Sequence, residues 1–507
     1  MDGTVPITGR DLSPAALVAI ARRAAAVTVD PGARDRMAAA ADVVRRAAEV
    51  GAPVYGVTTG LGPRVVQRLR DDELAAFSLA TIRGRAMAVG EPLSAELTRA
   101  AMAVRLNGLC AGGAGAGVAI ADALAALLNA GVHPIIPASG SVGASDLCLL
   151  AHVGLTLIGE GEAELGGDVM PSAEALARAG LGPVTLGPKD GLAICSSSAV
   201  SVAAAALALV DAESCLEDVQ IAAALSMEGF RANLSPLDPR VVAARPAPGQ
   251  AWAADGLLKL LGEGELTEPG AARRLQDPLS FRCVSQVHGG LRVALNQLSD
   301  AVAAELAGAA DNPLVLPEDD EILSTGNFHV PALALALDAV AVALAQVAAP
   351  SGERQARLKT ERLSGLPANL TTEAAARSGM GPLSKTAGAL VTEIRHAAAP
   401  FAVHPTVSAD GVEDDSTGAV PAALRVHAQL ARLRRLIALE LVVAAQAVTL
   451  AAPGRLGAGT AAAYALVREH VEALGEDRPL GPEIERLTRE ALATGRLRER
   501  VRETIRT

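Results

Sequence analysis

The amino-acid sequence predicts a mainly α-helical protein built on packed long helices. Half of its 507 residues are hydrophobic, yet aromatic residues make up only 2%. A core rich in Ala and Leu and poor in rings favours helix packing, because these two residues have high helix propensity. Apolar residues also recur at spacings of three and four over most of the chain, the periodicity of amphipathic helices. A chain of this length exceeds one ordinary core, so we expect two or three large parts.

The first part of the chain reads as shorter helices followed by a small hairpin. Helical periodicity covers 17–26, 35–50, 94–109, 118–130 and 147–158. The glycine-rich stretch 159–168 predicts a turn or small hairpin, and a short helix is expected over 171–179. The stretch 181–191 is rich in Gly and Pro and predicts a loop.

Longer helices are predicted beyond residue 190. They cover 198–224, 282–306, 331–346, 386–396 and 421–452. Charge density rises from Arg468 onward, so 496–506 is expected to be a solvated terminal helix. We therefore predict an N-terminal domain over 1–190, a long-helix bundle over 191–467 and a charged helical tail over 468–507.

Composition excludes several classes of function. The net charge of −11 opposes a general role on nucleic acid or an anionic membrane. The five cysteines are scattered without a CxxC pair, and the first residues lack an export signal, so a reduced, cytoplasmic location is expected. The apolar stretches 199–210 and 330–349 are interpreted as buried helices, not membrane spans. The eight histidines show no metal-ligand spacing, so no metal site is predicted.

One motif is too specific for composition to explain. The segment Pro-Ala-Ser-Gly-Ser-Val-Gly-Ala-Ser-Asp-Leu spans 137–147 and is followed by Leu-Ala-His at 150–152. Further blocks agree with it in order and spacing: Tyr-Gly-Val-Thr-Thr-Gly-Leu-Gly at 55–62, Val-Gly-Glu-Pro-Leu at 89–93, Lys-Asp-Gly-Leu-Ala at 189–193, Asp-Asn-Pro-Leu at 311–314 and Gly-Asn-Phe-His at 326–329. With these blocks the chain resembles the histidine and aromatic amino-acid ammonia-lyase family, from about Leu17 to about Leu450.

This resemblance implies an architecture as well as a chemistry. The fold would be ammonia-lyase-like, a helical bundle core of the fumarase/aspartase kind with a smaller N-terminal domain. The subunit would form a homotetramer in which three chains assemble each active site around a small-molecule substrate. The family makes a methylidene-imidazolone (MIO) electrophile from Ala-Ser-Gly, when the Gly amide nitrogen attacks the Ala carbonyl and two waters leave.

The third residue of that triad differs here. The chain reads Ala144-Ser145-Asp146, without the glycine. If Asp146 takes the glycine position, its Cβ is expected to crowd the bend that only Gly tolerates. If Asp146 keeps its usual place, the loop is one residue short. Under either alignment, residues 145–146 are interpreted as the N-cap region of the following helix, and we predict that the MIO group and any other cofactor are absent.

Other positions depart from the family pattern in the same direction. The family's electrophile-holding Asn-Gly-Thr is replaced by serines at 196–198, and its second catalytic tyrosine by Leu279. Its Ser-His before the Val-Gly-Glu-Pro-Leu block is Gly84-Arg85, and its late Gln-Glu-Asp-His is Val-Glu-Asp-Asp at 412–415. Together these changes predict an altered function.

Several candidate site residues remain. By resemblance, Tyr55 is the catalytic base and Glu393 a catalytic glutamate near the reacting amine. The predicted substrate-binding residues are Arg282, for a carboxylate, together with Asn312, Gln286, Phe328 and, as a new anion contact, Arg85. Each has a structural alternative: a loop-anchoring tyrosine, a solvated helix glutamate, an ion-pair arginine or a surface arginine. His288 and His329 are interpreted as scaffold.

Three functions stay open from the sequence alone. The first is a lyase-like enzyme without the MIO group, in which Tyr55 and Glu393 perform acid–base elimination, isomerisation, conjugate addition or cyclisation on a carboxylate- or carbonyl-bearing molecule of specialised biosynthesis. The second is a conventional ammonia-lyase or aminomutase. The third is a non-catalytic partner subunit of a mixed tetramer.

Overall fold

A computed structural model of the chain describes residues 3–372, 376–403 and 406–506. These residues are mostly helical, which confirms the predicted fold class. They form two compact units, each assembled from three stretches of the chain. Unit 1 comprises Met1–Val210, Leu298–Leu337 and Pro400–Leu424, and unit 2 comprises Asp211–Gln297, Asp338–Ala399 and Arg425–Thr507. The division at residues 190 and 467 stays a prediction.

Unit 1 combines short helices with small sheets. Its helices are α1 (Pro14–Arg23), α2 (Pro31–Glu49), α3 (Asp71–Arg85), α4 (Ala95–Cys110), α5 (Val118–Ala130), α6 (Leu147–Leu157), α7 (Ser172–Arg178) and α8 (Asp190–Cys195). Its strands are β1 (Val5–Ile7), β2 (Val27–Val29), β3 (Val89–Pro92), β4 (Val132–Pro134), β5 (Pro137–Ser139), β6 (Glu162–Leu165), β7 (Asp168–Pro171), β8 (Leu314–Leu316) and β9 (Glu321–Leu323).

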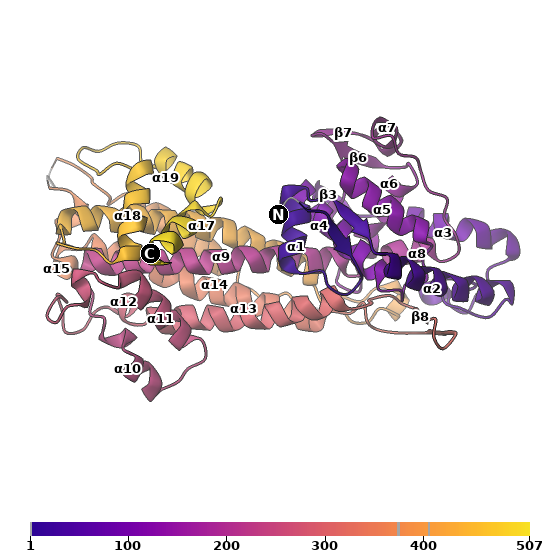
Figure 1. Cartoon of the computed structure of the whole chain (residues 1–507), viewed down its shortest axis with the longest axis horizontal. Coiled ribbons are helices and arrows are strands. Elements are labelled where there is room, and N and C mark those ends of the chain that lie inside the picture. Colours follow the sequence, from indigo (N-terminus) through magenta and orange to yellow (C-terminus); the bar gives the residue numbers. More distant parts are fainter. Residues whose placement is uncertain (1–2, 373–375, 404–405, 507) are drawn as a thin grey trace. The chain divides into compact units, whose positions relative to one another are not determined.

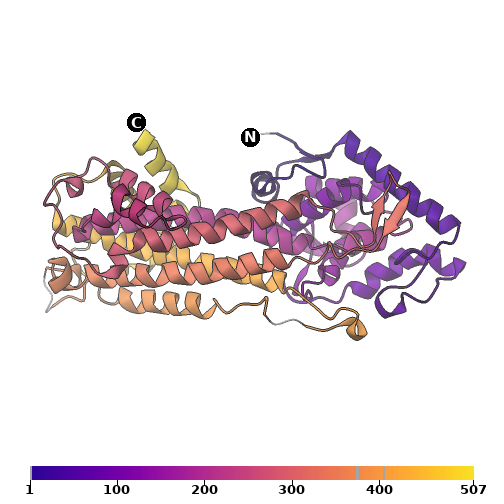
Figure 2. The same ribbon diagram turned by 90° about the horizontal axis from the view of Figure 1, so that it is seen from below.

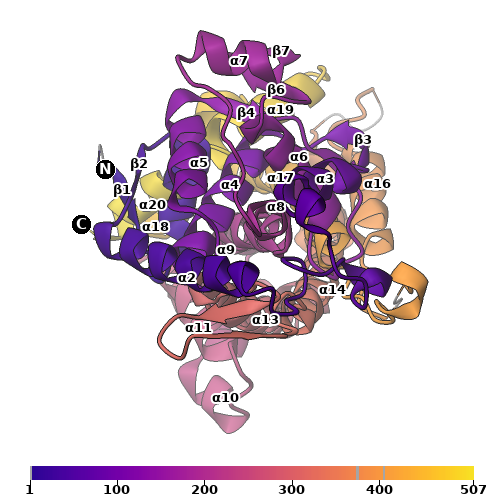
Figure 3. The ribbon, with the colours of Figure 1, turned by 90° about the vertical axis from the view of Figure 1, so that its right-hand side faces the viewer.

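The small sheets hold the loops of unit 1 in place. β1 and β2 pair in parallel, whereas β3–β5, β4–β6–β7 and β8–β9 pair antiparallel. β6 and β7 form the hairpin that was predicted around 159–168, and α7 packs beside it (Figure 3). α4 lies at the centre of the unit, is buried along almost its whole length, and packs against α1 and α5.

Local capping explains why two helices begin earlier than their apolar pattern. α1 starts at Pro14 because the side chain of Ser13 accepts a hydrogen bond from the Ala16 amide. α2 starts at Pro31 in the same way, with Asp30 as its N-cap. In both helices a proline sits at the first helical position, where its missing N–H removes no hydrogen bond.

Four long helices contribute residues to both units. They are α9 (Ala199–Phe230), α13 (Val284–Ala307), α14 (Pro331–Leu358) and α17 (Ala419–Ala451), and they run side by side (Figures 1 and 2). The close packing of α9 on α17 depends on a small residue, because a Cβ on Gly229 would lie 2.8 Å from that of Ala447. The remaining helices of unit 2 are α10 (Pro239–Ala244), α11 (Gln250–Leu261), α12 (Leu279–Arg282), α15 (Glu361–Ser364), α16 (Leu383–His396), α18 (Ala458–His470), α19 (Gly481–Leu487) and α20 (Arg496–Arg506).

A buried ion pair fixes three of the long helices to one another in unit 2. Arg354 Nε of α14 lies 2.5 Å from Glu440 Oε1 of α17, and both side chains are 1% exposed. The Glu440 carboxylate also accepts hydrogen bonds from the hydroxyls of Ser226 of α9 and Ser351 of α14. Because both charges are paired and hydrogen-bonded, their burial is tolerated and their geometry sets the register of these helices.

Two helical segments are long and apolar enough to cross a membrane by length and composition alone. They are Asp190–Phe230 and Pro331–Leu358. In the first, 94% of the most apolar window is buried inside the protein, and in the second 56% is buried. The first is therefore a core helix of this fold, as the sequence predicted.

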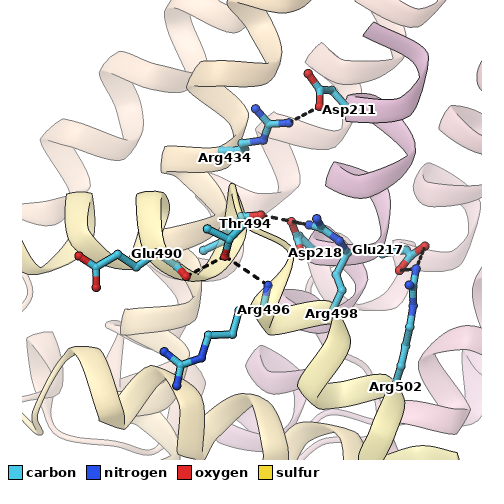
Figure 4. Close-up of polar contacts among 10 residues, drawn as sticks. Asp211, Glu217, Asp218, Arg434, Glu490, Thr494, Arg496, Arg498 and Arg502 are labelled. Carbon is cyan, nitrogen blue, oxygen red and sulfur yellow. Dashed lines mark hydrogen bonds and ion pairs between the residues drawn. The ribbon is translucent and has the colours of Figure 1, made fainter. Parts of the chain in front are cut away.

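The C-terminal helix α20 covers the predicted residues 496–506 and is largely exposed, but one of its faces packs on α18 and contacts α9. Leu497 and Val501 are buried, and Arg498 Nη1 lies 2.5 Å from the buried Asp218 (Figure 4). Arg502 of the same helix pairs with Glu217, the residue before Asp218 in α9. The docking of α20 depends on these partners from distant parts of the chain, and the high content of charged residues in the sequence after Arg468 did not predict them.

Asp218 gives the docked helix a pH-dependent stability. Burial raises the pKa of the Asp218 carboxyl to about 7, although Arg498 and Arg434 oppose the shift. An unfolded aspartate titrates near pH 3.9, so this group's contribution to stability is complete below about pH 4 and is lost as the pH rises through about 7.

We expect Asp218→Asn to remove this part of the pH dependence. Between pH 4 and 7 the free energy of unfolding of the wild type should fall by up to about 1.4 kcal/mol per pH unit on account of this group. Urea unfolding of both proteins across this range measures the difference. Glu469→Gln, at the more exposed pair with Arg496 of α20, is the matched control and should keep the wild-type slope. An unchanged slope in Asp218→Asn would contradict the assignment.

Candidate active site

The motif 143–146 forms a tight turn in unit 1. Gly143 and Ser145 both have positive φ, 88° and 61°, and they pair with each other across the turn. A Cβ on Gly143 would lie 2.2 Å from Thr417 Oγ1, so only glycine fits there. The Thr417 hydroxyl donates to the carbonyl of Gly143 at 3.0 Å. The strained residue is thus Ser145 and not Asp146, whose φ is −105°.

Asp146 joins the turn to two helices. It occupies the N-cap position of α6, as predicted, but its side chain does not cap that helix. Instead the carboxylate accepts hydrogen bonds from the amide and hydroxyl of Ser201 in the first turn of α9, at 2.8 and 3.0 Å, and from the Ser141 hydroxyl at 2.8 Å. Its amide donates to the carbonyl of Ser197 at 2.8 Å. Burial raises the pKa of Asp146, and these hydrogen bonds oppose the shift.

The segment around Phe328 closes the other side of the turn. Ala144 pairs with His329, and the Ser198 hydroxyl donates to the Phe328 carbonyl at 2.6 Å. His329 Nε2 lies 3.2 Å from Asp415 Oδ2. The structure therefore brings the triad, Ser198, Phe328 and Asp415 together.

A second polar cluster in unit 1 contains Asn312, Asp311 and Arg105. Asn312 Oδ1 accepts from the amide of Thr325, whose hydroxyl donates to the carbonyl of Asp311. Asp311 in turn pairs with the buried Arg105 at 2.6 Å. Burial lowers the pKa of the neighbouring Lys189 to about 8. Sequence reasoning missed Arg105, although an arginine inside the apolar pattern 94–109 was a signal of a buried partner.

Tyr55 and Arg85 also lie in unit 1. The Tyr55 hydroxyl oxygen accepts a hydrogen bond from the amide of Gly62 at 3.0 Å, so the tyrosine anchors its own loop. Arg85 is half-buried at the end of α3, and its charge acts on the thiols of Cys148 in α6 and Cys195 in α8. Arg85 thus faces the helix that follows the turn.

The other predicted site residues lie in unit 2. Arg282 donates to Gln276 Oε1 at 2.9 Å, and Gln286 accepts from the Ser285 hydroxyl at 3.2 Å. Glu393 pairs with Arg432 at 2.5 Å on the surface of unit 2, which is the structural alternative considered for it. His288 is buried, in agreement with a scaffold role. The predicted residues therefore divide between the two units, and the catalytic and binding roles stay predictions.

Known proteins resemble the chain along almost all of its length. The family model described as aromatic amino acid lyase matches residues 12–469. The histidine ammonia-lyase of Symbiobacterium thermophilum is 40% identical over 94% of this chain and 95% of its own. The structure of Trypanosoma cruzi histidine ammonia-lyase aligns with a TM-score of 0.92 at 31% identity, over 99% of this chain and 95% of that one. The ergothioneine-degrading ergothionase of Treponema denticola aligns with a TM-score of 0.92 at 30% identity, over 97% and 99%.

Two of the sequence predictions are corrected by these relatives. An enzyme that has left the MIO group behind, and so needs no cofactor, was predicted. Relatives named histidine ammonia-lyase at 37 to 40% identity, each covering 94% of the chain, favour a conventional histidine ammonia-lyase and imply the MIO group. The predicted MIO-less function and the predicted absence of a cofactor are therefore wrong. They gave the substituted positions, Asp146 above all, more weight than the similarity of the whole chain.

The turn supplies the atoms that this group needs. Ring closure uses the carbonyl of the first residue, the whole of the serine and only the backbone nitrogen of the third, and Ala144, Ser145 and Asp146 contain all of these. The two positive φ angles provide the bend. The amide of Asp146 donates a hydrogen bond to the carbonyl of Ser197. Closing the ring would break this hydrogen bond, because the same nitrogen would bond to the Ala144 carbonyl carbon.

We expect Asp146→Ala to lower the free energy of unfolding by about 1–3 kcal/mol, because it leaves the buried polar groups of Ser141 and Ser201 without their acceptor. Asp146→Asn keeps one acceptor oxygen and should lose less. Thermal or urea unfolding measures both. Asp300→Ala on the exposed face of α13 is the control, with a change within about 0.5 kcal/mol. Equal stabilities of Asp146→Ala and the control would show that the carboxylate does not join the two helices.

Proposed function

Because this chain belongs to the aromatic amino acid lyase family, we propose that it is an ammonia-lyase and that it eliminates ammonia from an α-amino acid, with histidine as the first substrate to test. The observation that carries this proposal is the 40% identity to a histidine ammonia-lyase over 94% of the chain. A small-molecule substrate is what membership of this family leads us to expect. The turn at 143–146 also supports the proposal, because contacts with Thr417, with the serine run 196–198 and with His329 fix its conformation.

The MIO group, when formed from Ala144, Ser145 and Asp146, supplies an electrophile that makes a weakly acidic proton of the substrate removable. The residues around the turn would hold it: Thr417 through the Gly143 carbonyl, and Ser198 through the Phe328 segment. The turn also lies at the first residues of α6 and α9, whose N-terminal dipoles favour negative charge there.

The remaining residues are proposed to bind the substrate and move its protons. Tyr55 is the base: its phenolic oxygen, in the deprotonated form, accepts the substrate proton, while the Gly62 amide donates a hydrogen bond to the same oxygen and holds it in place. Arg282 binds the substrate carboxylate, because its planar guanidinium matches a carboxylate in two hydrogen bonds. Asn312 and Phe328 line the pocket.

Gln286, Glu393 and Arg85 complete the proposed site. Gln286 lies in the first turn of α13, directly after the short helix that ends at Arg282, and adds a polar contact to the proposed pocket. Glu393, in contrast, is placed near the amine by the resemblance alone. Arg85 is a further anion contact beside α6. We also propose a cytoplasmic homotetramer, in which the site residues of unit 1 and unit 2 that form one active site come from different copies.

Ammonia release tests the proposed activity. The purified wild type should release ammonia from L-histidine, and L-tyrosine and L-phenylalanine test the related substrate class. Ser145→Ala, which removes the side chain that the electrophile requires, should abolish release while the helical circular dichroism spectrum stays the same. If the wild type releases no ammonia from any of the three amino acids, the proposal is wrong.

Tyr55→Phe tests the proposed base. It removes the phenolic oxygen, so kcat should fall by about 100-fold or more while the fold persists. The Gly62 amide also loses its acceptor, which is a structural effect of its own. Gly62→Ala, which keeps the hydroxyl but perturbs a glycine at positive φ, separates the two effects and should affect kcat less. Turnover by Tyr55→Phe equal to that of the wild type would remove Tyr55 from the mechanism.

A further inference from the structure

A small, partly open cavity is bordered by Ser197 and Ser198 of the serine run beside the turn. Its polar or backbone-exposing lining consists of Arg105, Asn107, Gly108, Ser197, Ser198 and Glu305, all of them in unit 1. The space open to the centre of a water molecule is about 10 Å³. This is close to the smallest volume that holds one water molecule, so the cavity is too small for an organic ligand.

Arg105 presents unused donors to this cavity. Its side chain is 1% exposed, and Nη2 donates to Asp311 and to the carbonyl of Ala193. Nε and Nη1 have no acceptor among the described residues. A Cβ on Gly108 would lie 3.2 Å from Nη1, so this nitrogen lies over a residue that lines the cavity. A buried guanidinium donor without an acceptor is costly, and it therefore points to a small ligand that accepts hydrogen bonds.

Glu305 lines the same cavity from α13. Burial raises the pKa of its carboxyl to about 7, and no ion pair with a described residue offsets this burial. Such a carboxyl group gains from a hydrogen-bond donor. The cavity therefore combines a buried donor without an acceptor, on Arg105, with a half-buried carboxyl group, on Glu305.

A water molecule suits both groups better than an anion does. A monovalent anion would accept from Arg105 but would be repelled by the Glu305 carboxylate, and the charge of Arg105 is already balanced by Asp311. A water molecule accepts from Nη1 and donates to Glu305 at the same time. We propose that this cavity is the site of one structural water molecule that bridges Arg105 and Glu305 and fixes the position of Ser197 and Ser198 behind the turn.

This inference rests on the proposed function where it concerns turnover. The Ser197 carbonyl holds the Asp146 amide, and the Ser198 hydroxyl holds the Phe328 carbonyl. A displacement of residues 197–198 is thus transmitted to the turn and to the wall of the pocket. Arg105 and Glu305 are positioning residues, because they act on the site through these two serines.

Gly108→Ala displaces the water without removing a hydrogen-bonding side chain. Its new methyl group enters the cavity beside Arg105, so kcat for ammonia release should fall by about 10- to 100-fold while KM changes little, since small displacements of catalytic groups have effects of this size. Gly388→Ala is the matched control: it also adds a methyl group inside a helix, α16, but meets no atom within 4 Å, and its kinetics should equal the wild type's.

Glu305 provides the second test. Glu305→Gln keeps polar atoms that bind the water and should retain more turnover than Glu305→Leu. A high-resolution crystal structure of the wild type should show one ordered water within hydrogen-bond distance of Arg105 Nη1 and the Glu305 carboxyl, and the structure of Gly108→Ala should lack it. Density for an anion, no ordered density, or Gly108→Ala kinetics equal to those of Gly388→Ala would overturn the inference. If the wild type releases no ammonia at all, the proposed function fails, and the two crystal structures still decide whether the water is present.

Discussion

The candidate site depends on the hydrogen bonds of one buried aspartate, Asp146. Asp146 holds the first turn of α9 with its carboxylate and the carbonyl of Ser197 with its amide, so the turn 143–146 and the starts of two helices are fixed to one another. The Thr417 hydroxyl and the pairing of Ala144 with His329 fix the other side. A carboxylate so deeply buried is stable only because three donors serve it.

The sequence predicted the elements that follow from local rules. Apolar periodicity located the long helices, including α13 and α17, and glycine spacing located the β6–β7 hairpin. Interactions between distant segments could not be predicted in this way. The docking of α20 depends on the burial of Asp218, and the ion pair of Arg354 with Glu440 joins residues 86 positions apart. The early starts of α1 and α2 had a local signal, a capping residue followed by proline.

Only part of the candidate site could be predicted, again because some of its interactions join distant segments of the chain. The motif placed the turn, and the resemblance indicated which segments surround it, but the hydrogen bonds of Asp146 to Ser201 and of Arg105 to Asp311 depend on tertiary structure. The inference that a changed third residue removes the electrophile followed from the expected crowding at Asp146. In the structure the left-handed backbone is at Ser145, whereas Asp146 has a negative φ of −105°. That steric argument therefore did not apply.

The central claim is that Ala144, Ser145 and Asp146 form the MIO group of a conventional ammonia-lyase, although the third residue is an aspartate. Intact-mass spectrometry of the purified protein, followed by fragmentation of the peptide that contains Ala144, Ser145 and Asp146, tests this claim most directly. We expect a mass lower than that of the encoded chain by two water molecules, with the loss located at these three residues. An unmodified mass at this peptide would contradict the account.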